Sequence, residues 1–595
     1  MFGWWECCAA SCCERVYEEF LEDPEPFSLP SPLPQWPKGY GHGQTVWIVV
    51  YGCLLYNVLC SMSQFYMIEE EDGLEFRVGT LTGRFKTFTG KGFATGKICL
   101  GEIEVVKITE FEKIWSCSLL SRKANAVTFY KPVGIPDGYS SLGHYCQPSD
   151  RKLRGYVLVA KCISSDESQG SKSVSPALTK PLNYTLGFVV TTEPEEPDLE
   201  EVRCVREDLT ESCEVDEVIF ERNSLFSKGR IYVWNTRPCR RGMLCKGVPI
   251  GTFFCSQDED SENDMSIACL KNLDSSLLAM PNLDQVHALI KHYGPTVYFH
   301  PDEAFLPSSV SWFFENGALL YKDGRDKGLA IDSKGSNLPG GGRNDGRFWL
   351  DLPVDSNGSD YVKSGSMETA ELYVHVKPAS GGTFTDIAMW IFCPFNGPST
   401  IKAGAFNYTF SRIGQHVGDW EHYTLRLSNF DGELWSVYFS EHSGGEWLDA
   451  SELEFIDGNK PIVYASKSGH ASFPHEGCYI QGSTKLGIGA RNDCAKSNYS
   501  VDSSTKYRVI AAEYLGDEIE EPQWLQYMRE WGPTVVYDSR SELDKILKHL
   551  PFFVRFSLEN LIELFPTELY GEEGPTGPKE KDNWLGMKDA SLVIS

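Results

Sequence analysis

Residues Gln415-His-Val-Gly-Asp-Trp-Glu-His422, followed by Tyr-Thr-Leu-Arg-Leu427, decide the fold of the second half of the chain. The residues after Glu421 alternate and are rich in Tyr, Thr and Leu, which predicts a β-strand over 419–427. Because residues two apart on a strand share a face, Asp419 and Glu421 point the same way as the apolar residues that follow them. We expect this face to be turned toward a core.

Two carboxylates at the start of a core-facing row are unfavourable without a counter-charge. A divalent cation at the mouth of a β-sandwich supplies one, and His416 on the incoming loop completes a cluster with Asp419 and Glu421. Hard oxygen ligands with one imidazole suit Mg²⁺, Ca²⁺ or Mn²⁺ better than a thiolate-seeking metal. An alternative stays open, because acidic residues near a strand end are usually solvated or salt-bridged and single histidines are usually structural.

The composition describes an acidic, β-rich chain. Its 595 residues allow about three or four domains, and its 15 tryptophans and 54 glycines favour strands and turns over helical bundles. The formal net charge of −28 argues against nucleic acid as a partner, because phosphate binding needs a basic surface. The sequence contains no phosphate-binding loop, dinucleotide fingerprint or nucleophile elbow, so we expect no nucleotide ligand.

The first residues lack the basic and apolar regions of a secretory signal, which predicts a cytoplasmic protein. Cysteines beside two tryptophans are candidate lipidation sites that would hold the chain on endomembranes, with ordinary thiols as the alternative: Cys7, Cys8, Cys12 and Cys13. Residues 45–68 carry no charge and are long enough to span a membrane, so an anchor here is a further alternative. Polar residues within the run and an acidic flank after it weaken that interpretation.

Strand-like runs separated by Gly and Pro predict a fold that is mainly β. We expect two consecutive β-sandwich-like domains and a short C-terminal helical segment, because apolar residues recur at helical spacing in 541–565. The expected regions are a Pro-rich leader at 1–39, a region with the apolar run at 40–91, a first β-domain at 92–265, a β-sandwich at 266–540, and a helix with an acidic tail at 541–595.

Several segments carry a family resemblance, among them Gly92-Phe-Ala-Thr-Gly96, Tyr293-Gly-Pro-Thr-Val-Tyr-Phe-His-Pro-Asp-Glu303 and Tyr570-Gly-Glu-Glu-Gly-Pro-Thr-Gly-Pro578. Over nearly the whole chain they resemble the plant proteins called vacuolar protein sorting-associated protein 62. The resemblance implies a role in endomembrane or vacuolar protein sorting, with sorting-machinery proteins as partners. It also implies that residues 40–91 are an insertion, and that a Pro-rich segment found in the family after Leu186 is missing here.

A second resemblance concerns the candidate cation site. The segment Met389-Trp-Ile-Phe-Cys-Pro-Phe-Asn396, together with His416-x-x-Asp-Trp-Glu421, is similar to the core of the necrosis- and ethylene-inducing-like proteins. Those are secreted β-sandwich cytolysins that hold a divalent cation and recognise plant sphingolipid glycans. The resemblance implies that the His, Asp and Glu of this motif bind Mg²⁺ or Ca²⁺, with Asn396 near the place of a further acidic ligand. Gly418 stands where those proteins have a second histidine, and the resemblance implies no cytolytic activity.

Two functions follow from these patterns. The first is a non-enzymatic protein that binds a membrane lipid or a glycan with the help of a divalent cation. The second is a metal-dependent hydrolase in which downstream histidines help the carboxylates to activate water. The histidines that would support the site in either case are His422, His442, His470 and His475. Because Gly-adjacent histidines often only cap turns and no complete catalytic set is visible, the sequence favours binding over catalysis.

Overall fold

The computed structural model describes most of the chain after residue 91 and one stretch before it. The N-terminal cysteines, the apolar run 45–68, the predicted helix at 541–565 and His442 lie outside the described residues. These described residues are 24–39, 92–118, 126–162, 174–176, 183–184, 186–192, 201, 203–222, 231–256, 267–275, 277–403, 406–441, 444–483, 488–537, 571–572 and 574–586.

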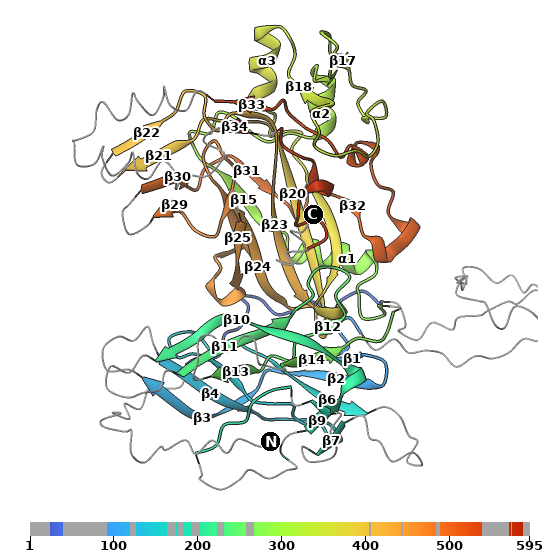
Figure 1. Cartoon of the computed structure of the whole chain (residues 1–595), viewed down its shortest axis with the longest axis vertical. Coiled ribbons are helices and arrows are strands. Elements are labelled where there is room, and N and C mark those ends of the chain that lie inside the picture. The colour runs from blue at the N-terminus through green and yellow to red at the C-terminus, as the bar shows by residue number, and fades with distance from the viewer. Residues whose placement is uncertain are drawn as a thin grey trace, which may run out of the picture.

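The described chain forms two structural bodies. The first contains the strands between Lys97 and Lys271, which are antiparallel and are drawn in blue to green in Figure 1. Its five-stranded sheet packs against two smaller sheets, because Val105 and Leu158 of one smaller sheet share a core with Leu270 of the large sheet, and Phe129 of the other shares one with Phe253. The five-stranded sheet has the order β12 (Gly247–Val248), β14 (Ala268–Lys271), β10 (Thr210–Arg222), β11 (Ile231–Pro238) and β13 (Phe253–Ser256). The smaller sheets are β1 (Lys97–Cys99), β2 (Ile103–Ile108) and β6 (Val157–Cys162); β3 (Phe111–Ser118), β4 (Ala126–Pro132) and β5 (Tyr145–Pro148); and β7 (Val174–Pro176), β9 (Arg203–Arg206) and β8 (Asn183–Tyr184).

The second body is a sandwich around a six-stranded sheet. One face of this sheet packs against α1 (Leu283–Tyr293) and a second sheet, and the other face packs against α2 (Val310–Glu315) and a group of tryptophans. The six-stranded sheet has the order β25 (Gly444–Asp449), β24 (Leu434–Glu441), β23 (His416–Ser428), β20 (Phe384–Asn396), β19 (Leu372–Ala379) and β32 (Tyr507–Ala511). The second sheet has the order β26 (Phe455–Ile456), β27 (Lys460–Ala465), β15 (Thr296–Phe299) and β31 (Ser500–Asp502), and β28 (Ser472–Phe473) pairs with β27.

Further short elements extend this body around the sandwich (Figure 1). They are β22 (Phe406–Thr409), β21 (Thr400–Ala403), β30 (Ile488–Cys494) and β29 (Gly477–Ser483) in one sheet; β17 (Leu329–Ala330), β16 (Leu319–Lys322) and β18 (Phe348–Asp351) in another; the pair β33 (Val535–Val536) and β34 (Gly571–Glu572); and α3 (Ser356–Lys363).

Helix α1 shows how local sequence sets an element. The Asn282 side chain accepts a hydrogen bond from the backbone N–H of Gln285, and the Gln285 side chain accepts one from the backbone of Asn282, so the helix begins at a complete capping box. Val286, Leu289 and Ile290 then form the stripe that packs on the six-stranded sheet.

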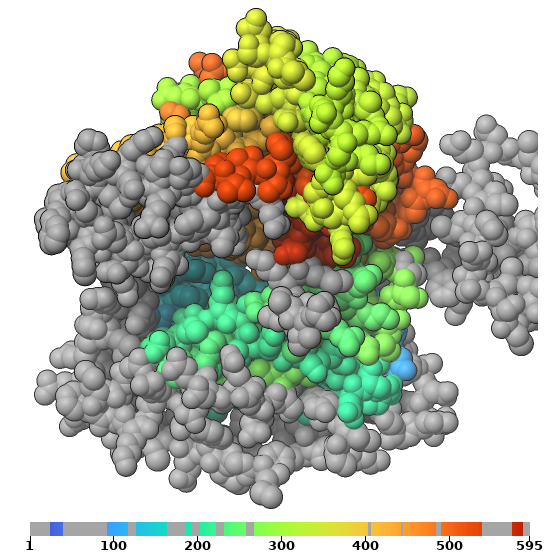
Figure 2. All heavy atoms as spheres, turned by 45° about the horizontal axis from the view of Figure 1, so that its top comes forward, coloured from blue at the N-terminus to red at the C-terminus, as the bar shows by residue number. Residues whose placement is uncertain are grey.

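The two bodies are joined through buried charge. Arg154 of the first body, 5% exposed, pairs with Glu433 at 2.8 Å and with Asp449 at 3.1 Å in the second. Its guanidinium also lies over the rings of Phe27 and Trp435. Figure 2 shows the dark red C-terminal residues in the region where the bodies meet, and there the Met243 N–H donates to the Leu585 carbonyl at 3.0 Å.

The predicted fold class is confirmed: the described chain is mainly β, with sheets packed face to face in both bodies and most strand pairs antiparallel. Among the described residues, no helix is both long and apolar enough to cross a membrane.

Candidate metal centre

Strand pairing at the centre of the six-stranded sheet places the predicted carboxylates. Asp419 lies opposite Cys393, and Glu421 lies opposite Ile391, in the antiparallel pair β20–β23. Residues farther along both strands, such as Tyr423, are buried in the core on the same face. The predicted strand is confirmed within β23, and its two carboxylates do begin the core-facing row.

A parallel strand pair brings in two more groups. Strands β15 and β27 run side by side in the same direction, so the segments that follow them leave at the same edge of their sheet. Glu303 lies in the segment after β15, and His470 lies in the turn after β27. Both side chains are buried, and His470 lies between Glu303 and Asp419.

His470 is held between two carboxylates. Its Nδ1 lies 2.8 Å from Asp419 Oδ2, and its Nε2 lies 3.8 Å from Glu303 Oε2. Burial alone lowers the pKa of His470, but contacts with Cys393, Asp419 and Glu303 outweigh it and raise the pKa well above 6.5. Burial raises the pKa of Asp419, but the hydrogen bond and the charge of His470 outweigh burial and hold the Asp419 pKa below 3.8. The protonated His470 is therefore a cation that lies between the carboxylates of Asp419 and Glu303 and balances their charge.

The turn that presents His470 has an uncommon backbone. Ser468 has φ of 67° and His470 has φ of 55°, in the left-handed region that non-glycine residues seldom adopt. Contacts hold the turn in place: the Ser468 N–H donates to Glu303 Oε2 at 2.6 Å, and its carbonyl accepts from the Gly397 N–H at 2.8 Å. Such strain persists only where surrounding structure determines it, and it is concentrated at functional sites.

Glu421 lacks the compensation that Asp419 has. Its half-buried carboxylate accepts a hydrogen bond from the Ser440 hydroxyl at 2.9 Å. Burial, and then the negative charge of Asp419, raise the pKa of Glu421 to about 8, while Lys581 acts in the opposite direction. A carboxylate with this pKa is largely protonated at neutral pH unless a cation joins it.

His416 and Asn396 lie opposite each other at the ends of β23 and β20. His416 is buried, and its desolvation lowers its pKa to about 4 although the charge of Asp419 acts in the other direction. Its imidazole is therefore neutral at pH 7. The Asn396 amide nitrogen donates to the carbonyls of Gly414 at 2.5 Å and Gly397 at 3.2 Å, so its carbonyl oxygen is the atom with which it could bind a metal ion.

The backbone at Gly418 explains why this motif lacks the second histidine of the necrosis- and ethylene-inducing-like proteins. It has φ of 72°, and a Cβ at this position would lie 2.3 Å from the Trp531 carbonyl oxygen. A histidine at Gly418 would collide with Trp531, so the backbone excludes the second motif histidine.

The other predicted histidines lie elsewhere. His422 is buried with its ring 4.3 Å from the ring of Trp390, and its Nε2 accepts from the Asn583 side chain at 2.8 Å, on the opposite face of the sheet from Glu421. His475 is paired with Glu454 at 3.0 Å and is partly exposed to solvent. Of the predicted histidines beyond His416, the described structure brings only His470 to the carboxylates.

The sequence interpretation missed Glu303, Cys393 and Lys581. One atom each from Cys393, Asp419 and His470 lie within 4.8 Å of one another, close enough to share a metal ion. Burial raises the pKa of Cys393 to about 11, so this thiol is protonated at neutral pH. Lys581, from the C-terminal segment, acts electrostatically on Asp419 and Glu421. No pattern within 415–427 could have identified these partners.

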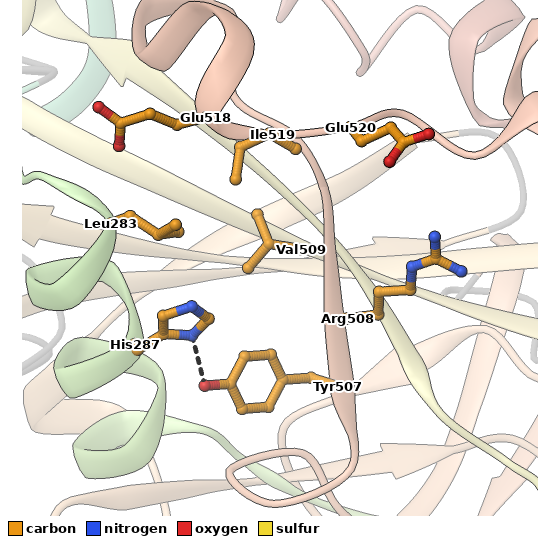
Figure 3. Close-up of a pocket in the computed structure, with 8 residues that line it drawn as sticks. All are labelled: Leu283, His287, Tyr507, Arg508, Val509, Glu518, Ile519 and Glu520. Carbon is orange, nitrogen blue, oxygen red and sulfur yellow. Dashed lines mark hydrogen bonds between the residues drawn. The ribbon is translucent and has the colours of Figure 1, made fainter.

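A separate hollow of about 390 Å³ opens between α1 and the edge strand β32 (Figure 3). Its floor combines apolar side chains with the hydrogen-bonded pair His287 Nδ1 and Tyr507 Oη, 2.8 Å apart. It shares no lining residue with the carboxylate cluster; its lining is Leu283, His287, Tyr507, Arg508, Val509, Glu518, Ile519 and Glu520.

Sequence comparison identifies the family. The model of the family described as "Vacuolar protein sorting-associated protein 62" matches residues 85–186 and 185–588, which is most of the chain. The chain belongs to this family. A member from Saccharomyces cerevisiae, Vacuolar protein sorting-associated protein 62, is 25% identical over 215 residues, covering 31% of this chain and 44% of the yeast protein. The match to that member thus spans less than half of its length.

Solved structures resemble this family member only at low similarity. GNIP1Aa from Chromobacterium piscinae matches with 14% identity and a TM-score of 0.23, covering 32% of this chain and 40% of that one. NLPPya in complex with glucosamine matches with 15% identity and a TM-score of 0.20, covering 39% and 75%. Necrosis and Ethylene inducing Protein 2 from the causal agent of cocoa's Witches Broom disease matches with 13% identity and a TM-score of 0.19, covering 38% and 74%. Similarity at this level carries no argument about the site or the function.

Proposed function

We propose that the chain is a non-enzymatic binding protein of vacuolar protein sorting. Its second β-sandwich holds a divalent cation, Mg²⁺ or Ca²⁺, and recognises a membrane lipid or a glycan when the cation is bound. Membership of the family supports the sorting role, and sorting-machinery proteins are the expected partners. The protein acts from the cytoplasm, peripherally on endomembranes.

One observation carries the cation proposal: the half-buried Glu421 stands beside Asp419, and no cation within the described residues forms an ion pair with it. A divalent cation between the two carboxylates removes their repulsion and restores the Glu421 anion at neutral pH. His416 adds a neutral imidazole, the form in which histidine binds metal. The carbonyl oxygen of Asn396 is a further hard donor at the same end of the strand pair.

A second candidate is a metal-dependent hydrolase, and it is supported by the closeness of Cys393, Asp419 and His470. A thiolate and an imidazole favour Zn²⁺ over Mg²⁺ or Ca²⁺. Zinc would have to displace the Cys393 proton and the ion-pair proton of His470, both of which the structure stabilises. The two candidates differ in their ligands, so Cys393→Ser abolishes zinc binding in the second and leaves Mg²⁺ or Ca²⁺ binding intact in the first.

The binding proposal is tested by flotation with anionic and neutral vesicles and by a glycan panel, each with Ca²⁺, with Mg²⁺ and with a chelator. We expect selective binding that the chelator removes and that Asp419→Asn abolishes. Asp360→Asn, which changes an exposed carboxylate on α3, serves as the matched control. Binding to none of these surfaces by a metal-loaded protein would contradict the recognition part of the proposal.

A further inference from the structure

The six-stranded sheet of the second body has an open edge at β32. This strand pairs with β19 on one side, and no other strand in the described part of the chain pairs with its other side. An open strand edge presents backbone N–H and C=O groups with which another chain can pair. Proteins usually block such an edge with proline, several charged side chains or a covering segment. Strand β32 contains no proline, and Arg508 is its one charged residue.

The pairing with β19 shows which backbone groups of β32 face outward. The two strands run parallel, with Tyr507 opposite Leu372 and Val509 opposite Val374. The Leu372 N–H donates to the Lys506 carbonyl at 3.0 Å, so the even-numbered residues at this end of β32 bond to β19. Because the backbone groups of successive residues alternate in direction along a strand, the N–H and C=O of Tyr507 and Val509 point to the open side.

The hollow of about 390 Å³ lies beside this edge, between β32 and α1 (Figure 3). The apolar side chains that line it are Leu283, Val509 and Ile519, and each is only partly buried against the sandwich core. At one end, Tyr507 Oη lies 2.8 Å from His287 Nδ1. The volume is at the lower end of the range of about 300–1,000 Å³ for ligand sites, so the hollow suits single side chains better than a large ligand.

The open edge and the hollow fit the same kind of partner. A strand that pairs with β32 has side chains that alternate between the two faces of the sheet. Every second side chain of that strand lies on the face of Tyr507 and Val509, which is the face that the hollow adjoins. An extended peptide can therefore pair its backbone with β32 and place apolar side chains in the hollow, a known mode of peptide recognition.

The charges around the hollow indicate which polar side chains the partner carries. The loop 517–520 has three exposed carboxylates, and it directs Ile519 toward the hollow. In Figure 3, Glu518 lies on the side of α1, and Glu520 lies on the side of Arg508. Arg508 is the only lysine or arginine among the described residues that line the hollow. Lysine or arginine side chains of a partner thus complement this surface better than acidic ones.

We propose that the open edge of β32 and the hollow beside it bind an extended peptide of a partner protein. The peptide adds to β32 as a strand and places an apolar side chain between Leu283, Val509 and Ile519. Its neighbouring Lys or Arg side chains lie near Glu518 and Glu520. This docking surface shares no residue with the carboxylate cluster, so either proposal can fail without the other.

A segment of the same chain is the competing occupant. The Asn282 side chain donates to the Lys38 carbonyl at 3.1 Å, so the chain before residue 40 ends beside the start of α1. Residues 40–91 lie outside the described residues, and the apolar run 45–68 within them carries no charge. That run has no cation to place near the carboxylates of the loop 517–520, and charge therefore favours a basic partner peptide.

The first experiment selects peptides on the full-length protein from a phage-displayed library of random nine-residue sequences. Val509→Pro serves for counter-selection, because it removes an N–H on the open side and leaves the groups that bond to β19. We expect enriched peptides that alternate apolar residues with Lys or Arg and bind Val509→Pro about tenfold more weakly than wild type. Enrichment of acidic peptides, or of none that distinguish the two proteins, would overturn the proposal.

The contribution of charge is measured with an enriched peptide. Glu518→Gln combined with Glu520→Gln should weaken its binding about fivefold at low salt, because two exposed ion pairs are lost. The difference should diminish as salt is added. Asp360→Asn, an exposed carboxylate on α3, is the matched control and should bind the peptide as wild type does. Equal binding by the double variant and wild type would show that the peptide does not meet this loop.

Residue-resolved hydrogen exchange tests the proposal in the unaltered chain, so the result does not depend on whether a variant folds. In the free protein, the amides of Tyr507 and Val509 should exchange faster than that of Arg508, which faces β19. The bound peptide should slow exchange at Tyr507 and Val509 by at least about tenfold. Slow exchange at both amides without peptide would show that another segment, such as 40–91, already pairs with β32. That result, or unchanged exchange with peptide bound, would contradict the proposal.

Discussion

Single residues in the carboxylate cluster differ in how their charge is balanced. Asp419 and Glu303 share the His470 cation, so each carboxylate keeps its charge in spite of burial. Glu421 stands beside Asp419 and has the Ser440 hydroxyl as its hydrogen-bond donor. The negative charge that His470 does not balance is therefore that of Glu421. This unbalanced carboxylate is what would distinguish a cation site from an ordinary buried ion pair.

The charge of Glu421 predicts a pH dependence of stability. Its pKa is about 8 in the folded chain against 4.5 ordinarily, so the fold favours the protonated form. This stabilisation is complete below about pH 4.5 and is lost as the pH rises to about 8. In a chelator, we expect wild type to lose about 2 kcal/mol more than Glu421→Gln between these limits, after allowing for solvent access. Urea unfolding at both pH values measures the difference; the exposed Glu446→Gln should behave as wild type, and parallel wild-type and Glu421→Gln curves would refute the assignment.

The His470 ion pair predicts a second residue-level effect. His470 has a raised pKa, so its contribution to stability is complete below about pH 6.5 and is lost as the pH rises through the folded value. Asp419→Asn removes the closest anion and should lower both the His470 pKa and the free energy of unfolding, the latter by about 3–5 kcal/mol. NMR titration of the histidine ring and denaturant unfolding report the two effects. An unchanged His470 titration would show that Asp419 does not hold its proton.

At the scale of elements, β23 depends on one glycine at its bend. Gly418→Ala must place a side chain at φ of 72° and 2.3 Å from the Trp531 carbonyl oxygen. We expect a loss of at least about 2 kcal/mol, because the left-handed conformation alone costs about 1–2 kcal/mol. Gly444→Ala is the matched control, since a Cβ at Gly444 meets nothing within 4 Å. Thermal unfolding of both variants makes the comparison, and equal stabilities would contradict this account of β23.

The elements also show how far the sequence could predict the structure. Alternation identified the strand and the inward row that begins at Asp419, because side-chain direction is a local property of a strand. It could not identify the neighbours of that row, because pairing partners are not encoded in the spacing. The parallel pairing of β15 with β27 brings Glu303 and His470 together, and the register of β20 sets Cys393 opposite Asp419. The histidines were predicted as site residues because they lie near glycines in the sequence. Of these, His470 reaches the carboxylates, whereas His475 pairs with Glu454.

At the scale of the whole molecule, Arg154 joins the two bodies. It is buried, it pairs with Glu433 and Asp449, and it donates to the Leu434 carbonyl at 2.7 Å. Arg154→Ala leaves those carboxylates without their partner, and we expect it to cost about 3 kcal/mol and to separate unfolding into two transitions. Arg151→Ala, which removes an exposed pair with Glu452 at 3.9 Å, should cost less than about 1 kcal/mol. Calorimetric unfolding distinguishes the two; a single unshifted transition in Arg154→Ala would show that the bodies are held by other contacts.

The central claim is a divalent cation held by Asp419 and Glu421, and calorimetric titration of Ca²⁺, Mg²⁺ and Mn²⁺ into the metal-free full-length chain tests it most directly. The account predicts saturable binding of one ion, accompanied at neutral pH by release of the Glu421 proton, and lost in both Asp419→Asn and Glu421→Gln. The exposed-carboxylate variant Asp360→Asn should bind as wild type does. No binding by the folded wild-type chain, or equal binding by all four proteins, would contradict the account and leave Asp419 and Glu421 as structural residues.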